Sequence, residues 1–397
     1  MKNRNFIILW IRDALFAAAA SLTSASVLSG FLVYAGIKED RISFYLAAVP
    51  FVNLIVSLLF SSVTARAKRT IPIYSLLCLV SGGLTGLYAL LFSVAGGKIL
   101  YLFLMVLGCL VSAVTAIRNI FDYKIPCEVM ELDDYSMYVS GCGIVGGVSG
   151  LIAGALLSLS YKHFSFTAVT CGAYLAAGIC YVTAGFINKS LKKIKAEKAE
   201  TSEEKSTGTL RGLFKDRTFR ILLLPNFIRG IGMAVVPMIA LLAINSKVIT
   251  ETDGATVTVF TYLATLVSCI VYVYLARRIG VARLCVLGAV LFCFLVPAFA
   301  GGKIVFYICY TVSYAGYYII NNAVPDLVYR NINPDMMSIF HTWRLALSTI
   351  GTTAATAVIG KLIGAVSPLW ILLIGAVAHI ICVAAYYAVF KNNKAKN

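Results

Sequence analysis

Charged residues are scarce in this sequence. They make up 13% of its 397 residues, against about 25% in soluble globular domains, whereas 60% are hydrophobic and the mean hydropathy is +0.88. This composition excludes an ordinary soluble protein and indicates an integral membrane protein. The net charge of +17 does not predict nucleic-acid binding, because the basic residues stand in short groups between apolar runs.

Motifs of membrane enzymes and ATP-driven pumps are also missing. The chain has only three histidines and contains no His-Glu-x-x-His, no Gly-x-Ser-x-Gly and no Gly-x-x-x-x-Gly-Lys-Ser/Thr motif. The pair Asp133-Asp134 lacks the further spaced aspartate that magnesium-dependent prenyl and phosphatidyl transferases use. The eleven cysteines form no Cys-x-x-Cys pair, and most lie in apolar runs, where they pack as small hydrophobes. The sequence therefore predicts no enzyme, no catalytic residue, no cofactor and no metal site.

Long apolar runs fill most of the chain. A membrane-spanning helix needs about 20 mostly apolar residues. Twelve stretches meet this requirement, and they cover residues 6–32, 42–64, 71–94, 99–121, 137–160, 165–187, 219–243, 255–276, 282–299, 303–324, 337–360 and 368–390. The first run has no small-x-small cleavage site, so we interpret it as a spanning helix and not as a signal peptide. The predicted fold class is an all-α polytopic membrane protein with twelve transmembrane helices.

The basic residues predict the orientation of these spans. With twelve spans, both termini and the segment between the sixth and seventh spans lie on one side. Segments on that side hold 22 basic residues and those on the opposite side hold seven. The positive-inside rule therefore predicts a multi-pass protein of the cell membrane with its N- and C-termini in the cytoplasm.

One segment, residues 188–217, is unusually rich in charged residues. Fourteen of its thirty residues are charged, nine basic and five acidic. Such a segment cannot bury enough apolar surface to offset the entropy of ordering it. We interpret it as a charged cytoplasmic linker between an N-terminal six-helix bundle, residues 1–187, and a C-terminal six-helix bundle, residues 218–397.

The two predicted bundles contain similar short segments in the same order. The matches are Asn3–Phe6 with Asp216–Phe219, Arg66–Arg69 with Arg277–Arg283, Ala95–Ile99 with Ala300–Ile304, and Lys124–Pro126 with Ala323–Pro325. Because each bundle has an even number of spans, the copies have the same orientation and form a parallel repeat.

The twelve spans, the parallel repeat, the charged linker and the basic loops together resemble the major facilitator superfamily (MFS). The loop Ser61–Thr70 keeps the basic residues of the family's loop signature, although Ala65 stands where that signature has aspartate. The later loop Leu275–Gly280 also lacks the acid. Glycines in the span 137–160 are similar to a drug-antiporter motif without its Gly-Pro pair. The subfamily therefore stays open.

This resemblance implies a secondary active transporter, or permease, whose two halves rock around a central cavity to alternate access. We expect it to move a small polar or anionic solute across the bilayer, coupled to a proton, sodium or another ion as in a symporter. We also expect it to work as a monomer. Two alternatives stay open: an MFS efflux pump for drugs or metabolites, and a non-transporting receptor or assembly factor on the same scaffold.

Ionisable side chains inside spans are costly, roughly 2.5 kcal/mol or more at mid-helix, so each needs a partner or a function. Arg229 lies about 15 Å into its span, near the midplane. It serves either a substrate or gating role or a structural ion pair. Arg12, Arg118 and Arg344 lie closer to the cytoplasmic headgroups, toward which they can snorkel. The in-span arginines outnumber Asp13 and Asp122 by two, which favours an anionic or polyhydroxy solute.

Amide and hydroxyl side chains supply further candidates for binding sugar-like or nucleoside-like ligands, although such groups also link helices in membrane proteins. The substrate-binding or gating candidates are Arg229, Asn226, Asn53, Asn321, Asn322 and Tyr317.

The ion-coupling candidates are the titratable or charged groups Asp13, Asp122, Arg118 and His341. The repeat places Asn226 at the position of Asp13, so only one half keeps a carboxylate there. Arg118 and Asp122 are four residues apart, which allows an ion pair along one helix. A structural role for each of these residues stays open.

Acidic residues after the fourth span lie on the same side as the basic loops. We expect them to form an ion-pair latch at the cytoplasmic gate, the alternative being a solvated loop with weak pairs. The gate candidates are Arg66, Lys68, Arg69, Glu128, Glu131, Asp133, Arg277 and Arg278.

Overall fold

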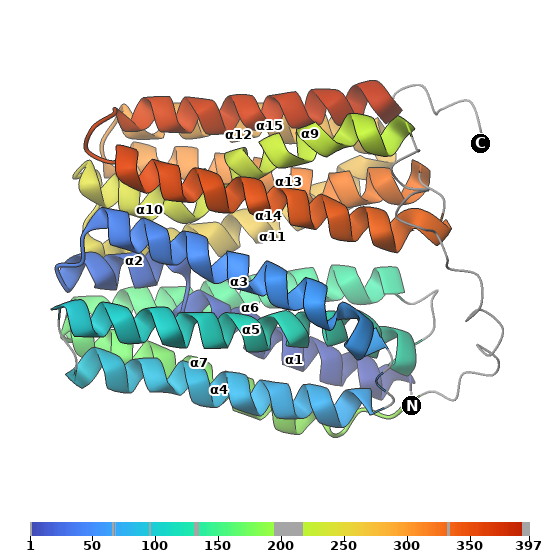
Figure 1. Cartoon of the computed structure of the whole chain (residues 1–397), viewed down its shortest axis with the longest axis horizontal. Coiled ribbons are helices and arrows are strands. Elements are labelled where there is room, and N and C mark those ends of the chain that lie inside the picture. The colour runs from blue at the N-terminus through green and yellow to red at the C-terminus, as the bar shows by residue number, and fades with distance from the viewer. Residues whose placement is uncertain are drawn as a thin grey trace. The chain divides into compact units, whose positions relative to one another are not determined.

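The computed structural model of the chain describes residues 2–65, 67, 69–94, 97–130, 135–193, 217–331 and 334–390. All of the named elements in these ranges are helices, and twelve segments are long and apolar enough to cross a membrane (Figure 1). The predicted all-α fold with twelve transmembrane helices is therefore confirmed. The first seven helices are α1 (Lys2–Leu22), α2 (Ala25–Tyr34), α3 (Glu39–Ala65), α4 (Thr70–Val94), α5 (Gly97–Val129), α6 (Tyr135–His163) and α7 (Phe166–Asn188).

The later helices follow the charged segment. They are α9 (Arg217–Met233), α10 (Val235–Asn245), the short 3₁₀ helix η2 (Glu251–Asp253), α11 (Gly254–Ile279), α12 (Val281–Phe292), the 3₁₀ helix η3 (Cys293–Phe299), α13 (Lys303–Asn331), α14 (Pro334–Leu362) and α15 (Pro368–Phe390).

Three predicted spans are not single α-helices. The span 6–32 is divided into α1 and α2, because Ser24 has an extended conformation and its side chain caps α2 by accepting from the Val27 N–H at 3.3 Å. The span 219–243 is divided at Ala234 into α9 and α10. The span 282–299 ends as a 3₁₀ helix that contains Pro297, which has no N–H to donate to an α-helical bond. Hydropathy predicts that a segment is buried in the membrane, but it carries no information on such breaks.

The chain forms two compact units. The first contains Met1–Lys195 and Ala240–Leu266, and the second contains Ala196–Ile239 and Val267–Asn397. In the first unit α4 packs along α7, α1 along α6, and α3 along α5; in the second, α12 packs along α13, and α9 along α14 and α15. The division into residues 1–187, the linker 188–217 and residues 218–397 stays a prediction, and most of that linker lies outside the described residues.

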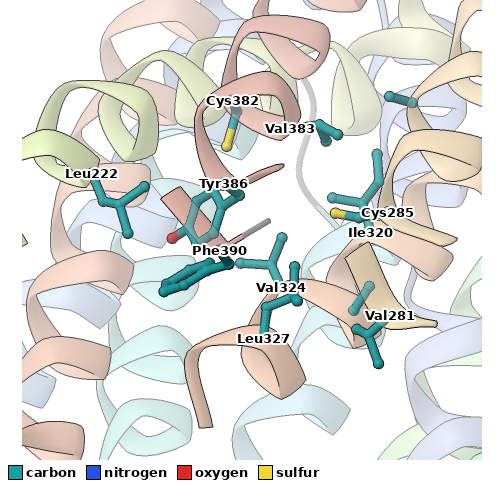
Figure 2. Packing of buried hydrophobic residues seen from close by; sticks show 12 residues of the cluster. Leu222, Val281, Cys285, Ile320, Val324, Leu327, Cys382, Val383, Tyr386 and Phe390 are labelled. Atoms are coloured by element: carbon teal, nitrogen blue, oxygen red, sulfur yellow. The ribbon is translucent and has the colours of Figure 1, made fainter. Parts of the chain in front are cut away.

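Each unit has its own buried apolar cluster. In the first unit this cluster joins α1, α4 and α5, with Leu9, Tyr74 and Ile125 fully buried. In the second it joins α9, α12, α13 and α15, with the ring of Tyr386 at its centre (Figure 2). Both clusters lie beside the buried polar side chains described below, and their packing restricts the rotamers of those side chains.

Candidate functional site

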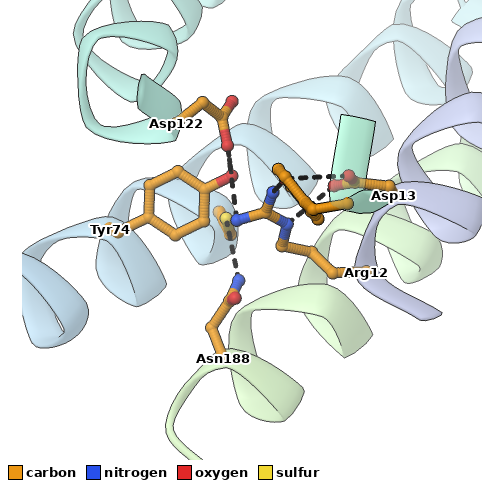
Figure 3. A network of polar contacts seen from close by, with 7 residues as sticks. Arg12, Asp13, Tyr74, Asp122 and Asn188 are labelled. Atoms are coloured by element: carbon orange, nitrogen blue, oxygen red, sulfur yellow. Dashed lines mark hydrogen bonds and ion pairs between the residues drawn. The ribbon is translucent and has the colours of Figure 1, made fainter. Parts of the chain in front are cut away.

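In the first unit, Arg12 is the centre of a buried ionic network. The residue is 2% exposed and projects from α1. Its Nε donates to Asp13 Oδ1 at 2.8 Å, its Nη2 donates to the Tyr138 hydroxyl at 2.9 Å, and its Nη1 lies 3.5 Å from Asp122 Oδ1. Figure 3 shows the guanidinium of Arg12 between the two carboxylates. One arginine therefore holds carboxylates from α1 and α5 together.

Two tyrosines complete this network. The Tyr74 hydroxyl, from α4, donates to Asp122 Oδ1, and the Tyr138 hydroxyl, from α6, donates to Asp13 Oδ2 at 3.2 Å. A phenol is an O–H donor at neutral pH, so each tyrosine can satisfy a carboxylate oxygen without adding a second charge. The network thus links α1, α4, α5 and α6, and each carboxylate has an arginine and a tyrosine as partners.

Arg118 does not form the predicted ion pair with Asp122. Asp122 pairs with Arg12 instead, and the Arg118 guanidinium lies 4.7 Å from the ring centroid of Phe16 and 4.8 Å from that of Tyr181. Spacing along a helix shows which side chains can meet, but here a residue on another helix supplies the carboxylate's partner. Nε and Nη1 of Arg118 are buried and have no hydrogen-bond partner among the described residues.

The buried arginines also differ from the expectation that they snorkel. Arg12, Arg118 and Arg344 are only 2%, 7% and 5% exposed, so protein and not the headgroup region surrounds them. Buried ionic groups in a membrane protein need partners within the protein. The cation–π contacts of Arg118 serve that purpose in part.

In the second unit, the described residues give Arg229 no carboxylate partner. Arg229 is 4% exposed on α9, and its Nη2 donates to Asn321 Oδ1 on α13. No carboxylate of the described residues lies within ion-pair distance of Arg229, and its Nε has no hydrogen-bond partner among them. The sequence predicted both residues as candidates, and the structure brings them together. The result is a buried cation whose charge is not neutralised by the described part of the chain.

Asn226 lies one turn before Arg229 and has a different partner. Its Nδ2 donates to the Leu222 carbonyl oxygen at 2.7 Å, and its Oδ1 accepts from the Tyr386 hydroxyl at 2.9 Å. This amide is 2% exposed, and these contacts fix its orientation. Asn226 therefore joins α9 to α15, and the contacts give it a packing role.

His379, on α15, is a buried polar residue that the sequence interpretation missed. Its ring is 1% exposed, stacks on Phe292 with centroids 4.1 Å apart, and hydrogen-bonds the Gly375 carbonyl oxygen through Nδ1 at 3.1 Å. Nε2 has no partner among the described residues. The candidate Tyr317 lies beside this pair, its ring centroid 6.1 Å from that of His379. A single histidine in an apolar run does not reveal from the sequence that its ring is buried against another ring.

The remaining amides lie apart from these networks. Asn53, on α3, donates to the Ser112 carbonyl oxygen at 3.3 Å, which links α3 to α5. Asn322 hydrogen-bonds Cys269 on α11. Both contacts are those of interhelical bridges. The ion-coupling candidate His341 belongs to α14, but its side chain lies outside the described set.

The predicted cytoplasmic latch is described only in part. Glu128 accepts a hydrogen bond from Thr70 and pairs with Lys193 Nζ at 2.7 Å. Arg69 is exposed, and the Arg278 guanidinium lies 4.1 Å from the ring centroid of Tyr274. The other candidates fall outside the described residues or side chains: Arg66, Lys68, Glu131, Asp133 and Arg277.

A family model described as "MFS/sugar transport protein" matches residues 128–333, just over half of the chain. The chain belongs to this family. It is an MFS secondary transporter and a multi-pass membrane protein, and both its family and its fold are those of transporters and not of enzymes. No curated protein sequence matches it.

Solved structures share its fold at low sequence identity. A point mutant of the nucleoside transporter NupG has a TM-score of 0.73 at 12% identity, covering 97% of this chain and 99% of that one. The xylose transporter XylE from E. coli has a TM-score of 0.71 at 11% identity, covering 96% of each chain. A point mutant of the E. coli fucose:proton symporter FucP has a TM-score of 0.61 at 16% identity, covering 97% and 98%. At these identities the similarity establishes the fold alone.

Proposed function

We propose that this transporter moves a small polar or anionic solute by alternating access, coupled to a proton or another cation. In this proposal the solute binds at Arg229 and Asn321, and the coupling ion acts on the carboxylates around Arg12. The observation that carries the proposal is the contrast between a buried arginine with two carboxylates and a buried arginine with none among the described residues.

Arg229 has the properties of a group that binds an anionic or strongly polar solute. A buried cation is unfavourable unless it is paired, and the described residues offer Arg229 only the neutral oxygen of Asn321. A carboxylate or phosphate of a solute would supply the missing charge and accept from the free Nε. The amide of Asn321 would in addition exchange hydrogen bonds with hydroxyl groups. The solutes for which the related transporters are named, a nucleoside, xylose and fucose, are polyhydroxy compounds, which is compatible with this chemistry.

The carboxylates of the first unit are suited to ion coupling. Protonation of Asp13 or Asp122, or binding of a cation to them, would compete with Arg12 for the same oxygens. Such competition would release Arg12 and loosen the contacts that join α1 to α5 and α6. A change of charge would therefore become a change in helix packing.

Alternating access requires helix contacts that open and close. Within the first unit, η2 and the start of α11 pack closely on α2 and α6: Ser24 Oγ lies 2.6 Å from Thr258 Oγ1, and Ser158 Oγ lies 2.8 Å from Thr256 Oγ1. A Cβ added to Gly254 would lie 2.5 Å from the carbonyl oxygen of Ser26, so only glycine permits this approach. If residues 1–187 and 218–397 are the two moving bodies, these contacts must separate in each cycle.

We further propose that the protein works as a monomer in the cell membrane with both termini in the cytoplasm, as the distribution of basic residues predicts. Modification of cysteines placed near each terminus by a membrane-impermeant thiol reagent tests the orientation. Labelling of intact cells at either terminus would contradict it.

Flux in proteoliposomes tests the transport proposal. Purified protein is reconstituted with an inward proton or sodium gradient, and uptake of labelled sugars, sugar acids, nucleosides and organic anions is measured. We expect gradient-driven uptake of at least one polar or anionic solute, with loss of its binding in Arg229→Gln. Transport of lipophilic cations alone would contradict the proposed solute class. Binding of a solute without any flux would instead indicate a receptor.

A further inference from the structure

The two carboxylates around Arg12 are not held equally. Arg12 Nε donates to Asp13 at 2.8 Å, whereas Arg12 Nη1 lies 3.5 Å from Asp122 Oδ1 without forming a hydrogen bond. Tyr74 donates to the same oxygen of Asp122, and Figure 3 shows that only this oxygen contacts the residues drawn. The second oxygen, Oδ2, accepts no hydrogen bond from the described residues. Asp122 therefore has the weaker contact with Arg12 and can accept from a further donor.

Arg118 is placed to supply that donor. It precedes Asp122 by four residues on α5, and side chains with this spacing lie on one face of a helix with Cβ atoms about 5–6 Å apart. Arg118 is 7% exposed, and its Nε and Nη1 have no hydrogen-bond partner in the described part of the chain. The charges of Arg12 and Arg118 both act on the carboxylate of Asp122. A change of rotamer would bring the guanidinium of Arg118 to this carboxylate without movement of α5.

In the described conformation two aromatic rings hold Arg118 instead. Its guanidinium lies 4.7 Å from the ring centroid of Phe16 and 4.8 Å from that of Tyr181. Such contacts attract a cation but do not neutralise its charge. An unpaired buried carboxylate is more costly than the loss of a ring contact. The rings should therefore lose Arg118 to Asp122 when Asp122 no longer has Arg12.

We propose that Arg118 is the second partner of Asp122 and pairs with its carboxylate when Arg12 is released. Asp122 then alternates between an arginine on α1 and an arginine on its own helix. This exchange keeps the carboxylate paired while the contact between α1 and α5 opens, so that no buried charge is left alone. Arg118 is thus a positioning residue for Asp122. As a step in transport the exchange rests on the proposed function, but the exchange itself is a property of the first unit.

Thermodynamic cycles of unfolding test the exchange with the full-length protein in detergent. The variant Arg12→Gln with Asp13→Asn removes Arg12 together with the other carboxylate that it holds, and leaves Arg118 and Asp122 as the charged pair. We expect Arg118→Gln to raise the equilibrium constant of unfolding about tenfold more in this double variant than in the wild type. Addition of Asp122→Asn should abolish that difference, because no carboxylate is left to pair. Arg118→Lys keeps a cation on this face of α5 and should give a smaller difference than Arg118→Gln.

The ring of Tyr181 supplies a second measurement with the opposite sign. When Arg118 pairs with Asp122 in the double variant, Tyr181 no longer contacts a guanidinium. Tyr181→Leu should therefore raise the unfolding constant about threefold less in the double variant than in the wild type. The matched control is Arg41, whose guanidinium lies 5.8 Å from the ring centroid of Tyr101 in the same unit. Arg41→Gln should have the same effect in the wild type and in the double variant.

Three outcomes would overturn the proposal. They are an equal effect of Arg118→Gln in the wild type and in the double variant, a difference that persists with Asp122→Asn, and an equal effect of Tyr181→Leu in both proteins. If Arg118→Gln prevents the double variant from folding, Asp122→Asn should restore folding, and failure to restore it would also overturn the proposal. None of these measurements uses a solute, so failure of the exchange is distinguishable from failure of the proposed transport function.

Discussion

The two units differ in the partners that surround a buried arginine. In the first, Arg12 contacts Asp13 and Asp122, so positive and negative charges are neighbours. In the second, Arg229 contacts the neutral Asn321, and Asn226 stands where the repeat has Asp13. The two units thus differ in whether the arginine is neutralised by carboxylates of the described chain. We propose that the neutralised site responds to a proton or cation and that the other binds a polar or anionic ligand.

Replacing each arginine by glutamine should give the largest difference in stability between the two units. Arg12→Gln leaves Asp13 and Asp122 without their cation, and removal of one partner from a buried pair costs about 3–5 kcal/mol. Arg229→Gln removes a charge that no described carboxylate neutralises, so the free energy of unfolding should change by less than about 1 kcal/mol. Thermal and denaturant unfolding in detergent measure both. Equal destabilisation by the two variants would show that Arg229 has a structural partner after all.

Loss of a tyrosine hydroxyl should also destabilise the first unit more than the second. Tyr74→Phe removes a hydrogen bond to the carboxylate of Asp122 and should cost about 1.5–3 kcal/mol. Tyr386→Phe removes a hydrogen bond to the neutral amide of Asn226 and should cost about 0.5–1.5 kcal/mol. The free energies of unfolding of the two variants show which substitution is more destabilising. The reverse order would indicate that charge does not distinguish the two units.

Asp13 and Asn226 occupy equivalent positions in the repeat, and exchanging their side chains tests whether the two units serve different functions. Asp13→Asn should abolish accumulation driven by the ion gradient while counterflow of the solute continues, because Arg12 keeps Asp122 and Tyr138. Asn226→Asp places a carboxylate one turn from Arg229, and should weaken binding of an anionic solute while coupling persists. Counterflow and gradient-driven uptake in the same proteoliposomes separate the two effects. Coupling that survives in Asp13→Asn would place the coupling ion elsewhere.

A further effect is expected at the aromatic contacts of Arg118. Phe16→Leu removes one of the two rings that lie against its guanidinium, and a desolvated cation–π contact is worth about 2 kcal/mol or more. Phe103→Leu, at an exposed position of α5, is the control for the loss of a ring. Equal unfolding free energies for the two variants would mean that Arg118 relies on groups other than Phe16.

The sequence predicted the fold well because its main signal is physical and local. Twenty apolar residues in a row have few alternatives to a spanning helix, and all twelve spans are present. The break after α1 was missed, since it depends on one capping serine, Ser24, within an otherwise continuous apolar run. The partner of a charged side chain was harder to predict than its position within a span. Arg118 and Asp122 have the spacing of an ion pair, yet Arg12 on another helix contacts the carboxylate, and no single-helix pattern contains that information.

The candidate residues divide in a similar way. Arg229 with Asn321 and Arg12 with Asp13 could be selected because charged or amide groups in apolar spans are costly and hence conspicuous. His379 could not, because its burial against Phe292 depends on how α12 and α15 pack. The predicted latch stays a prediction: its described acidic member, Glu128, pairs with Lys193 from the segment after α7, while Arg66, Lys68 and the side chain of Arg277 lie outside the described part of the chain.

The most direct test of solute binding at Arg229 is ligand-induced thermal stabilisation of three proteins: the wild type, Arg229→Gln and Asp13→Asn. A panel of sugar acids, nucleosides, neutral sugars, organic anions and lipophilic cations supplies the ligands. We predict that a polar or anionic solute raises the Tm of the wild type and of Asp13→Asn but leaves that of Arg229→Gln unchanged. An equal rise in Arg229→Gln, or a rise with lipophilic cations alone, would contradict the assignment of solute binding to Arg229.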